Sequence, residues 1–161
     1  MHEKNYKLNF ELIPDGCWYS NLRSFLPREV WDRVRRKAYA RANGKCAICG
    51  LSTDRPEAHE RWAYDESTAT QTLTDIVAVC RRCHEVIHIG RTQLMGRERE
   101  AEEWFMQVNG CSYADYRAAL GRANEEHARR NRIGEWKQDI SFLRTFLLIG
   151  DENKAHSKKE M

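Results

Sequence analysis

The stretch that decides the fold is VCRRCHEVIH, residues 79–88, in which two cysteines are followed by two histidines. Cys80 and Cys83 repeat the spacing of Cys46 and Cys49, and a long segment separates the two pairs. Two thiolates two residues apart on a tight turn bind one cation from two corners of a tetrahedron, and a second pair completes a Cys₄ site. The spacing therefore predicts a structural zinc ion, with a hairpin inserted between the pairs.

Two other interpretations compete for these cysteines. They are a set of free thiols buried as small apolar side chains, and a thioredoxin-like redox pair. A redox motif needs one pair next to a βαβ unit, so two matched pairs favour the metal site. The remaining cysteines, Cys17 and Cys111, lie beside aromatic residues and are expected to be small buried side chains.

Three histidines lie close to these pairs in the sequence. His84 and His88 are four residues apart, so on a helix both imidazoles project from one face. His59, on a strand-like stretch, is placed to supply a third ligand from across the hairpin. A Cys₄ site is closed, whereas three histidines leave positions open for water and for chemistry. The alternative is that His84 and His88 are core side chains oriented by hydrogen bonds.

Composition indicates the size of the domain and the cellular compartment more clearly than it indicates the function. The chain has 161 residues, 41% hydrophobic and 32% charged, which suits one compact domain with a small appendage. The net charge of +3 is too small to indicate a nucleic-acid partner. Neither a membrane-length apolar run nor a signal peptide is recognisable, so we expect no membrane association and a cytoplasmic protein. A reducing cytoplasm favours metal ligands over disulfides.

The chain divides into four predicted parts. Residues 1–26 form an extended arm that packs on the rest, 27–92 a metal-binding module, 93–150 a helical accessory region, and 151–161 a disordered polar tail. A helix is expected from residue 28 to Asn43-Gly44, with seven basic residues against two acidic ones over residues 28–45.

Periodicity and turn residues predict the remaining elements. A hairpin is expected over residues 56–74 with its tip at 65–69, followed by a short helix over 80–88 that ends near Gly90. Further helices are expected over 97–108 and from Ser112, where Asp115 completes a capping box. A last helix is predicted from four apolar residues at helical spacing and ends near Gly150. They are Trp136, Ile140, Leu143 and Leu147.

The cysteine pairs, together with PEAHE at 56–60, LTDI at 73–76 and the run at 79–88, resemble an HNH endonuclease domain with zinc knuckles. The resemblance covers residues 28 to about 90. It implies an α+β fold with a small ββα-metal module, flanked here by an N-terminal basic helix and a C-terminal helical region. Members of the family hydrolyse phosphodiester bonds in DNA, or sometimes RNA, with one divalent cation.

Carried over residue by residue, the resemblance makes His59, His84 and His88 the ligands of a catalytic Mg²⁺, Mn²⁺ or Zn²⁺. Glu60 stands where the family has its base histidine, and Asp75 where it has an asparagine. A carboxylate serves as a base if its pKa is raised, or if the metal lowers the pKa of the attacking water. The alternative roles are a solvent-facing strand residue for Glu60 and a cap or turn residue for Asp75. Glu57 and Glu85 are further carboxylates of lower priority.

The function expected from these residues is an HNH-type endonuclease that nicks one strand per active site. The alternative is a zinc module that lost the base and binds nucleic acid or a protein. Nucleic acid, DNA before RNA, is the expected partner, with phosphates held by the basic helix and by Arg81, Arg82 and Arg91. A charged helix face is otherwise simply solvated. Trp62 would stack on a base or anchor packing.

Two further expectations concern the rest of the chain and the size of the substrate. The helices after residue 97 carry no catalytic motif, so they brace the module, bind a protein partner or form a homodimer contact. Hydrolysis of a small nucleotide is a weaker alternative, because the sequence lacks a glycine-rich phosphate loop.

Overall fold

A long antiparallel hairpin lies at the centre of the computed structural model, which describes residues 5–18 and 21–148. Strands β1 (Glu57–Asp65) and β2 (Thr70–Val79) pair with His59 opposite Val77, and a register shift falls between Arg61 and Trp62. The predicted hairpin is confirmed, and its second strand extends further than expected. A short third strand, β3 (Lys137–Asp139), pairs parallel to β2, so the fold is mixed α+β with a three-stranded sheet.

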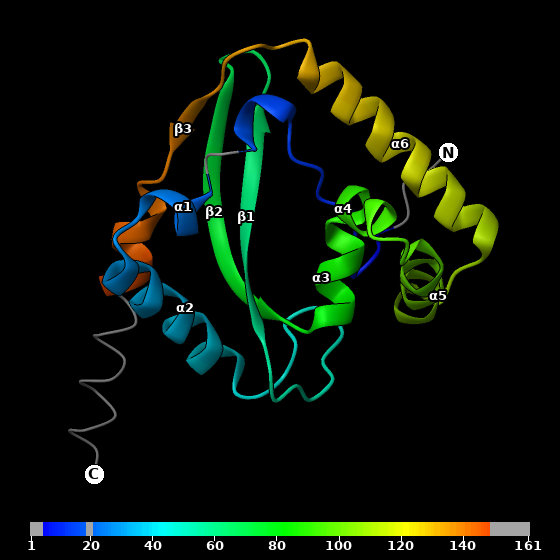
Figure 1. Ribbon diagram of the computed structural model, residues 1–161, viewed down its shortest axis with the longest axis horizontal. Helices are drawn as coiled ribbons and strands as arrows, with labels where there is room; N and C mark the ends of the chain where they lie inside the picture. Colours follow the sequence, from blue (N-terminus) through cyan, green and yellow to red (C-terminus); the bar gives the residue numbers. More distant parts are fainter. Residues whose placement is uncertain (1–4, 19–20, 149–161) are drawn as a thin grey trace.

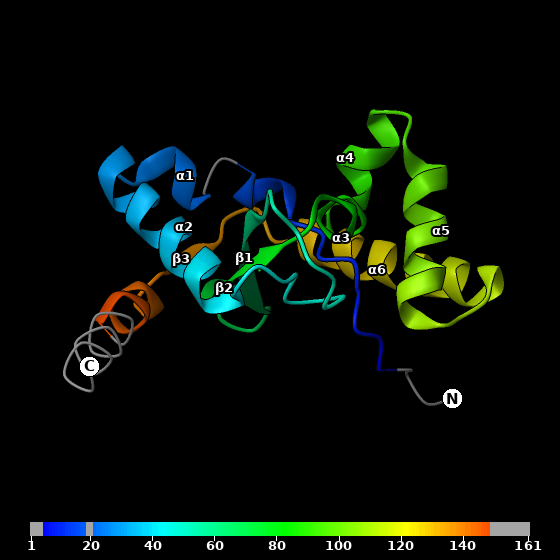
Figure 2. The same ribbon diagram turned by 90° about the horizontal axis from the view of Figure 1, so that it is seen from below.

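Helices flank the hairpin on two sides (Figure 1). Helices α1 (Leu22–Phe25) and α2 (Arg28–Ala42) lie on one side. Helices α3 (Arg81–Ile87), α4 (Ile89–Leu94), α5 (Glu98–Asn109) and α6 (Tyr113–Asn131) lie on the other. The view from below separates the same two groups (Figure 2).

The predicted basic helix is α2, and its apolar residues explain its position. Val34 and Ala38 are buried against Leu73 and Ile76 of β2. The helix ends at Asn43, whose left-handed backbone (φ 52°) is a conformation that asparagine tolerates better than most side chains. Because Val34 and Ala38 face the sheet, another face of α2, which includes Trp31 and Arg35, lines a groove.

The helix expected over residues 80–88 is interrupted where it was predicted to continue to Gly90. His88 has a non-helical backbone (φ −99°, ψ 54°), which separates α3 from α4, and Gly90 lies inside α4. Thr92 stabilises the break, because its hydroxyl donates to the carbonyl oxygens of Glu85 (2.6 Å) and His88 (3.2 Å).

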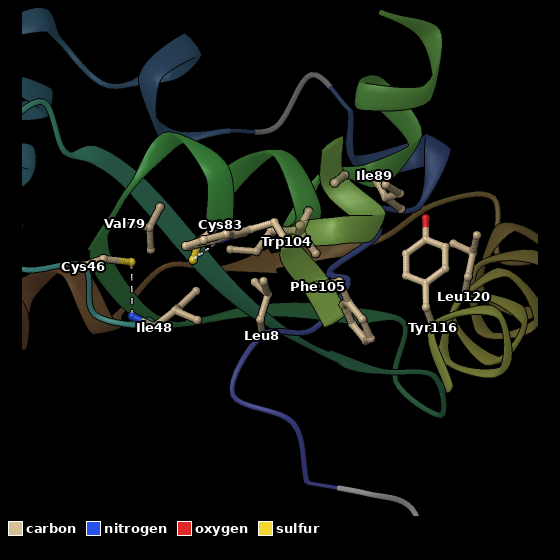
Figure 3. Close-up of a cluster of buried hydrophobic side chains, with 13 residues drawn as sticks. Leu8, Cys46, Ile48, Val79, Cys83, Ile89, Trp104, Phe105, Tyr116 and Leu120 are labelled. Carbon is tan, nitrogen blue, oxygen red and sulfur yellow. Dashed lines mark hydrogen bonds between the residues drawn. The ribbon is translucent and has the colours of Figure 1, made fainter. Parts of the chain in front are cut away.

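The larger core joins the arm, the cysteine loops and the later helices (Figure 3). Phe105 of α5 and Tyr116 of α6 are fully buried in it, together with Leu8 of the arm. The Asn109 side-chain amide holds Leu8 through two hydrogen bonds of 3.0 and 2.8 Å. The expected packing of the arm is therefore confirmed, although the arm also contains a 3-10 turn, Asp15–Cys17, and α1.

The predictions for α5 and α6 are confirmed in detail. Gly110 ends α5 in the left-handed conformation, and Ser112 and Asp115 form both hydrogen bonds of the capping box. The larger core contains residues from both sides of the predicted boundary at residue 92, such as Ile87 and Phe105. The division of the chain into four parts stays a prediction. Among residues 5–18 and 21–148, no helix combines the length and apolar character needed to cross a bilayer.

The helix predicted from Trp136 is wrong over its first turns. Residues 137–139 form β3 instead, where the Lys137 N–H donates to the Ala69 carbonyl oxygen (2.7 Å). The Asp139 carboxylate then accepts from the N–H and hydroxyl of Ser141, a local turn that delays the helix to residues 142–148. Sheet pairing overrode the apolar periodicity. The predicted helix end at Gly150 and the tail 151–161 lie outside the described residues.

Candidate metal sites and groove

The four paired cysteines converge as the spacing predicted. Their Sγ atoms all lie within 4.8 Å of one another, and the Sγ atoms of Cys49 and Cys80 are 3.9 Å apart. A tetrahedral zinc ion with Zn–S bonds of about 2.3 Å places its sulfurs about 3.8 Å apart. The cluster therefore has the ligand type, number and spacing of a structural zinc site.

Local N–H groups point at these sulfurs. The backbone N–H groups of Ile48 and Cys83 each donate over 3.4 Å, to Cys46 and Cys80 respectively. The indole Nε1–H of Trp104 donates to Cys83 Sγ over 3.3 Å (Figure 3). Such donors orient metal ligands and favour the thiolate form.

The crowded sulfurs favour one thiolate and oppose further ones: hydrogen bonds with Cys80 and Cys83 lower the pKa of Cys46. The hydrogen bond with Cys46 is the main cause that raises the pKa of Cys80 to about 11, and the same neighbour raises the pKa of Cys83. Several thiolates at this spacing require a cation to offset their repulsion. The donor set thus fits a metal such as zinc.

A second cluster brings His59 of β1 together with His84 of α3 and with His88, which directly follows α3. One ring nitrogen from each histidine forms a group whose members all lie within 4.8 Å of one another. The ring centroids are 4.7 to 5.4 Å apart, and the His59 side chain is only 3% exposed. The hairpin and the helix that follows it thus position three imidazoles around one point.

The histidines that follow the cysteine pair are held in the form that binds metals. Burial lowers the pKa of His84 and, with the neighbouring histidines, lowers the pKa of His88 to about 3. Both imidazoles are therefore neutral at pH 7. Glu57 Oε1 lies 2.7 Å from His84 Nδ1, which leaves His84 Nε2 available to a cation.

Glu60 borders the same region, but its carboxylate is bound elsewhere. The Leu22 N–H donates to Oε1 (2.8 Å) and the Trp62 indole donates to Oε2 (3.2 Å). Burial raises the pKa of Glu60, and the Leu22 N–H opposes that rise. The strand residue thus connects β1 to α1 in this structure.

Asp75 is not brought to the histidines. It lies within β2, paired with Arg61, and its Oδ1 is 3.8 Å from the Arg41 guanidinium. Asp75 therefore lies within β2, whereas the hairpin was expected to end one residue before it. The Asp75 side chain does not line the groove that opens over the histidines.

A groove of about 1600 Å³ opens over the histidine cluster. One wall is a stripe of α2 at helical spacing, and Trp62 and Arg91 also line the groove. The lining residues of α2 are Arg28, Trp31, Asp32, Arg35 and Tyr39. Basic, aromatic and acidic side chains therefore line the groove, and the carboxylates of Glu11 and Glu57 lie next to the imidazoles.

Only part of the predicted basic footprint reaches this groove. Arg28, Arg35 and Arg91 line it, whereas Arg81 donates to Glu85 (3.0 Å) and the Arg82 guanidinium stacks on Trp104, 4.9 Å from the ring centroid. The latter two arginines support α3 and the core.

The positions of the Glu57 and Glu11 carboxylates next to the histidines were not predicted from the sequence. Glu57 had low priority, although its place two residues before His59 puts it on the same strand face. Glu11 carried no sequence signal, because a distant arm brings its Oε1 to 3.1 Å from His59 Nε2.

Comparisons with protein-family models, curated proteins and solved structures found no match to this chain.

Proposed function

We propose that the protein is a metal-dependent, HNH-type endonuclease that hydrolyses phosphodiester bonds in DNA. The convergence of His59, His84 and His88 at the floor of the groove carries this proposal. The order of elements, two antiparallel strands and a helix closed by four cysteines, supports the ββα-metal interpretation. In this proposal zinc occupies the cysteine cluster, and Mg²⁺, Mn²⁺ or Zn²⁺ occupies the histidine cluster.

A divalent cation on three histidines neutralises phosphate charge and lowers the pKa of bound water. The residues of the chain supply the rest. Glu57 fixes the His84 ring, and Arg28 and Arg91 are placed to hold phosphate oxygens on either side of the histidines, whereas Arg35 donates to Asp32 (2.9 Å). The exposed Trp18 and the partly buried Trp31 present faces on which bases stack.

The size of the groove favours a polymer over a small nucleotide. Pockets for small molecules usually have volumes of about 300–1000 Å³. The groove exceeds that range, and side chains from Arg28 to Tyr39 of α2 line one wall of it. We therefore propose a nucleic-acid chain as the substrate.

A nicking assay tests the proposal. Purified protein is incubated with supercoiled plasmid or single-stranded DNA and Mg²⁺ or Mn²⁺, beside His59→Ala and His88→Ala. We expect nicked plasmid with the wild type and at least about a 100-fold loss in both variants, because each removes a cation ligand. Gln107→Ala, on the exposed face of α5, is the control. Absence of cleavage by the wild type, or cleavage by both histidine variants at the wild-type rate, contradicts the proposal.

The alternative is a zinc module that binds nucleic acid or a protein without cleaving. The observation that favours it is Glu60, whose two carboxylate oxygens already accept hydrogen bonds. Metal analysis separates the two functions, because the enzyme needs two bound cations per chain and the binding module one. Glu60→Gln adds a second criterion: loss of nicking with intact metal content identifies Glu60 as the base, and retained nicking assigns it a structural role.

A further inference from the structure

The N-terminal arm passes directly beside the histidine cluster. The Glu11 N–H donates to the Ile87 carbonyl oxygen (2.9 Å), which fixes the arm backbone next to the residue before His88. On one side of Glu11 the Asn109 amide holds Leu8. On the other side, the imidazole Nε2 of His127 lies 3.1 Å from the Ile13 carbonyl oxygen. The arm is thus held on both sides of Glu11.

The Glu11 side chain faces a buried atom that lacks a hydrogen bond. His59 Nε2 has no hydrogen-bond partner of acceptable geometry among the described residues, although Glu11 Oε1 is only 3.1 Å away. A polar atom buried without a hydrogen bond is costly, so such atoms mark places where an interaction is completed by a ligand or a small rotation. The 3.1 Å separation is already within hydrogen-bonding range for a rotated ring.

The neighbouring histidine shows the completed arrangement. Glu57 Oε1 is 2.7 Å from His84 Nδ1, on the ring nitrogen that does not face a cation. Metal-bound histidines generally donate their second ring N–H to such a carboxylate, which fixes the tautomer and the ring orientation. Glu11 is not a member of the group of ligand atoms within 4.8 Å, which comprises the three histidines among the described residues. Glu11 is therefore placed toward His59 as Glu57 is toward His84: next to a candidate ligand and outside the group of candidate ligands itself.

We propose that Glu11 is a positioning residue of the cation site, which accepts the Nε2–H of His59 and couples cation binding to docking of the N-terminal arm. The inference rests on the cation site of the proposed function and requires no cleavage. With a cation on its other ring nitrogen, the His59 imidazole would carry its remaining proton on Nε2. A small rotation of the ring would direct that N–H at Glu11 Oε1, 3.1 Å away, so occupation of the site and docking of the arm would stabilise each other.

Mn²⁺ binding by the full-length, zinc-loaded protein tests this coupling. Calorimetry compares the wild type with Glu11→Gln, with the conservative Glu11→Asp, and with Glu29→Gln on the exposed face of α2. We expect Glu11→Gln to weaken Mn²⁺ binding about 10- to 100-fold, as is typical for loss of an outer carboxylate. Glu11→Asp should recover part of that loss, and Glu29→Gln should bind as the wild type does.

Amide hydrogen exchange supplies a readout that a merely structural role would not change. Mn²⁺ should slow exchange at the Glu11 amide in the wild type, because that N–H bonds to Ile87 only when the arm is docked. In Glu11→Gln this protection by Mn²⁺ should disappear, while exchange in α5 and α6 stays as in the wild type. Unchanged exchange in these helices shows that the variant is folded.

The outcomes separate this inference from the proposed function. Equal Mn²⁺ affinity in the wild type and Glu11→Gln, with loss of binding in His84→Ala, overturns the role of Glu11 and keeps the cation site. A wild type whose histidine cluster binds none of Mg²⁺, Mn²⁺ and Zn²⁺ overturns both. Glu11-dependent Mn²⁺ binding without cleavage of any DNA supports the inference and overturns the endonuclease.

Discussion

Trp104 connects the cysteine cluster to the hydrophobic core through a single hydrogen bond. Its indole N–H donates to Cys83 Sγ, while the ring is buried between α3 and α5. We expect Trp104→Phe to keep an aromatic ring in the core and to remove only the donor. Zinc affinity, measured by competition with a chelator, should then fall about 10- to 100-fold because the thiolate loses its hydrogen bond.

Trp136→Phe is the matched control for this prediction. The Trp136 indole Nε1 is buried without a hydrogen-bond partner among the described residues, and its ring contacts Tyr64. This variant removes the same N–H group but should leave zinc affinity unchanged. Equal zinc loss in both variants would mean that packing, and not the N–H···S hydrogen bond, controls the site.

The two clusters of candidate ligands were predictable from the sequence, but the residues around them were not. The C-x-x-C spacing and the four-residue spacing of His84 and His88 are local properties, so the sequence predicted that these side chains lie close together. The contacts of Trp104 and Glu11 depend on how distant segments pack. The family resemblance also assigned Asp75 to the site, whereas its strand position directs it to Arg41.

At the scale of elements, Glu66 attaches the hairpin tip to α6 through a close ion pair with Arg129 and a longer one with Arg130 (3.9 Å). Glu66 accepts two hydrogen bonds from the Arg129 guanidinium, at 2.7 and 2.9 Å, and the Arg130 guanidinium lies over the Tyr64 ring. The hydrogen bond from Arg129 lowers the pKa of Glu66. A carboxyl whose folded pKa lies below its unfolded value contributes stability above the unfolded pKa and loses it as the pH falls through the folded pKa.

The pH dependence of Glu66→Gln follows from that sign. At pH 7 the variant should melt at a slightly lower temperature than the wild type, since the charge is lost from an exposed pair. The difference should shrink below the unfolded pKa of about 4.3 and vanish below the folded pKa. Thermal melts from pH 3 to 7 measure this, with Glu125→Gln, exposed on α6, as the control. A difference that stays constant with pH would rule out the ion pair as its cause.

Elements with local start and stop signals were predicted well, and those set by distant pairing were not. The capping box at Ser112 and the terminal Gly110 are encoded within a few residues. Strand β3 has only three residues, and all three are exposed. Its formation depends on the edge of β2, so an apolar period that runs through Trp136 and Ile140 predicted a helix in its place.

At the scale of the whole molecule, the two groups of helices form opposite walls of the groove. Composition gave no indication that arginines from both groups line one groove, because a net charge of +3 does not show which arginines share a face. In the folded chain, Arg28 at the start of α2 and Arg91 in α4 line the groove on different sides of the hairpin. A nucleic-acid strand that crosses the histidines would meet both.

Salt dependence of DNA binding tests this arrangement. For duplex DNA, each phosphate contact adds about 0.9 to the slope of log K against log salt concentration. In a cleavage-deficient His88→Ala background, Arg28→Ala and Arg91→Ala should each lower the slope by about 0.9, and the double variant by about 1.8. Fluorescence anisotropy with a labelled duplex measures the slopes.

Arg122→Ala is the control, because Arg122 is exposed on α6 and does not line the groove. Its slope should match that of the parent. A loss in only one of the two groove variants would place the DNA along one wall, and equal slopes in all variants would exclude the groove as the binding surface. Additive losses require the bound duplex to contact α2 and α4 at once, as expected if it crosses the three histidines between them.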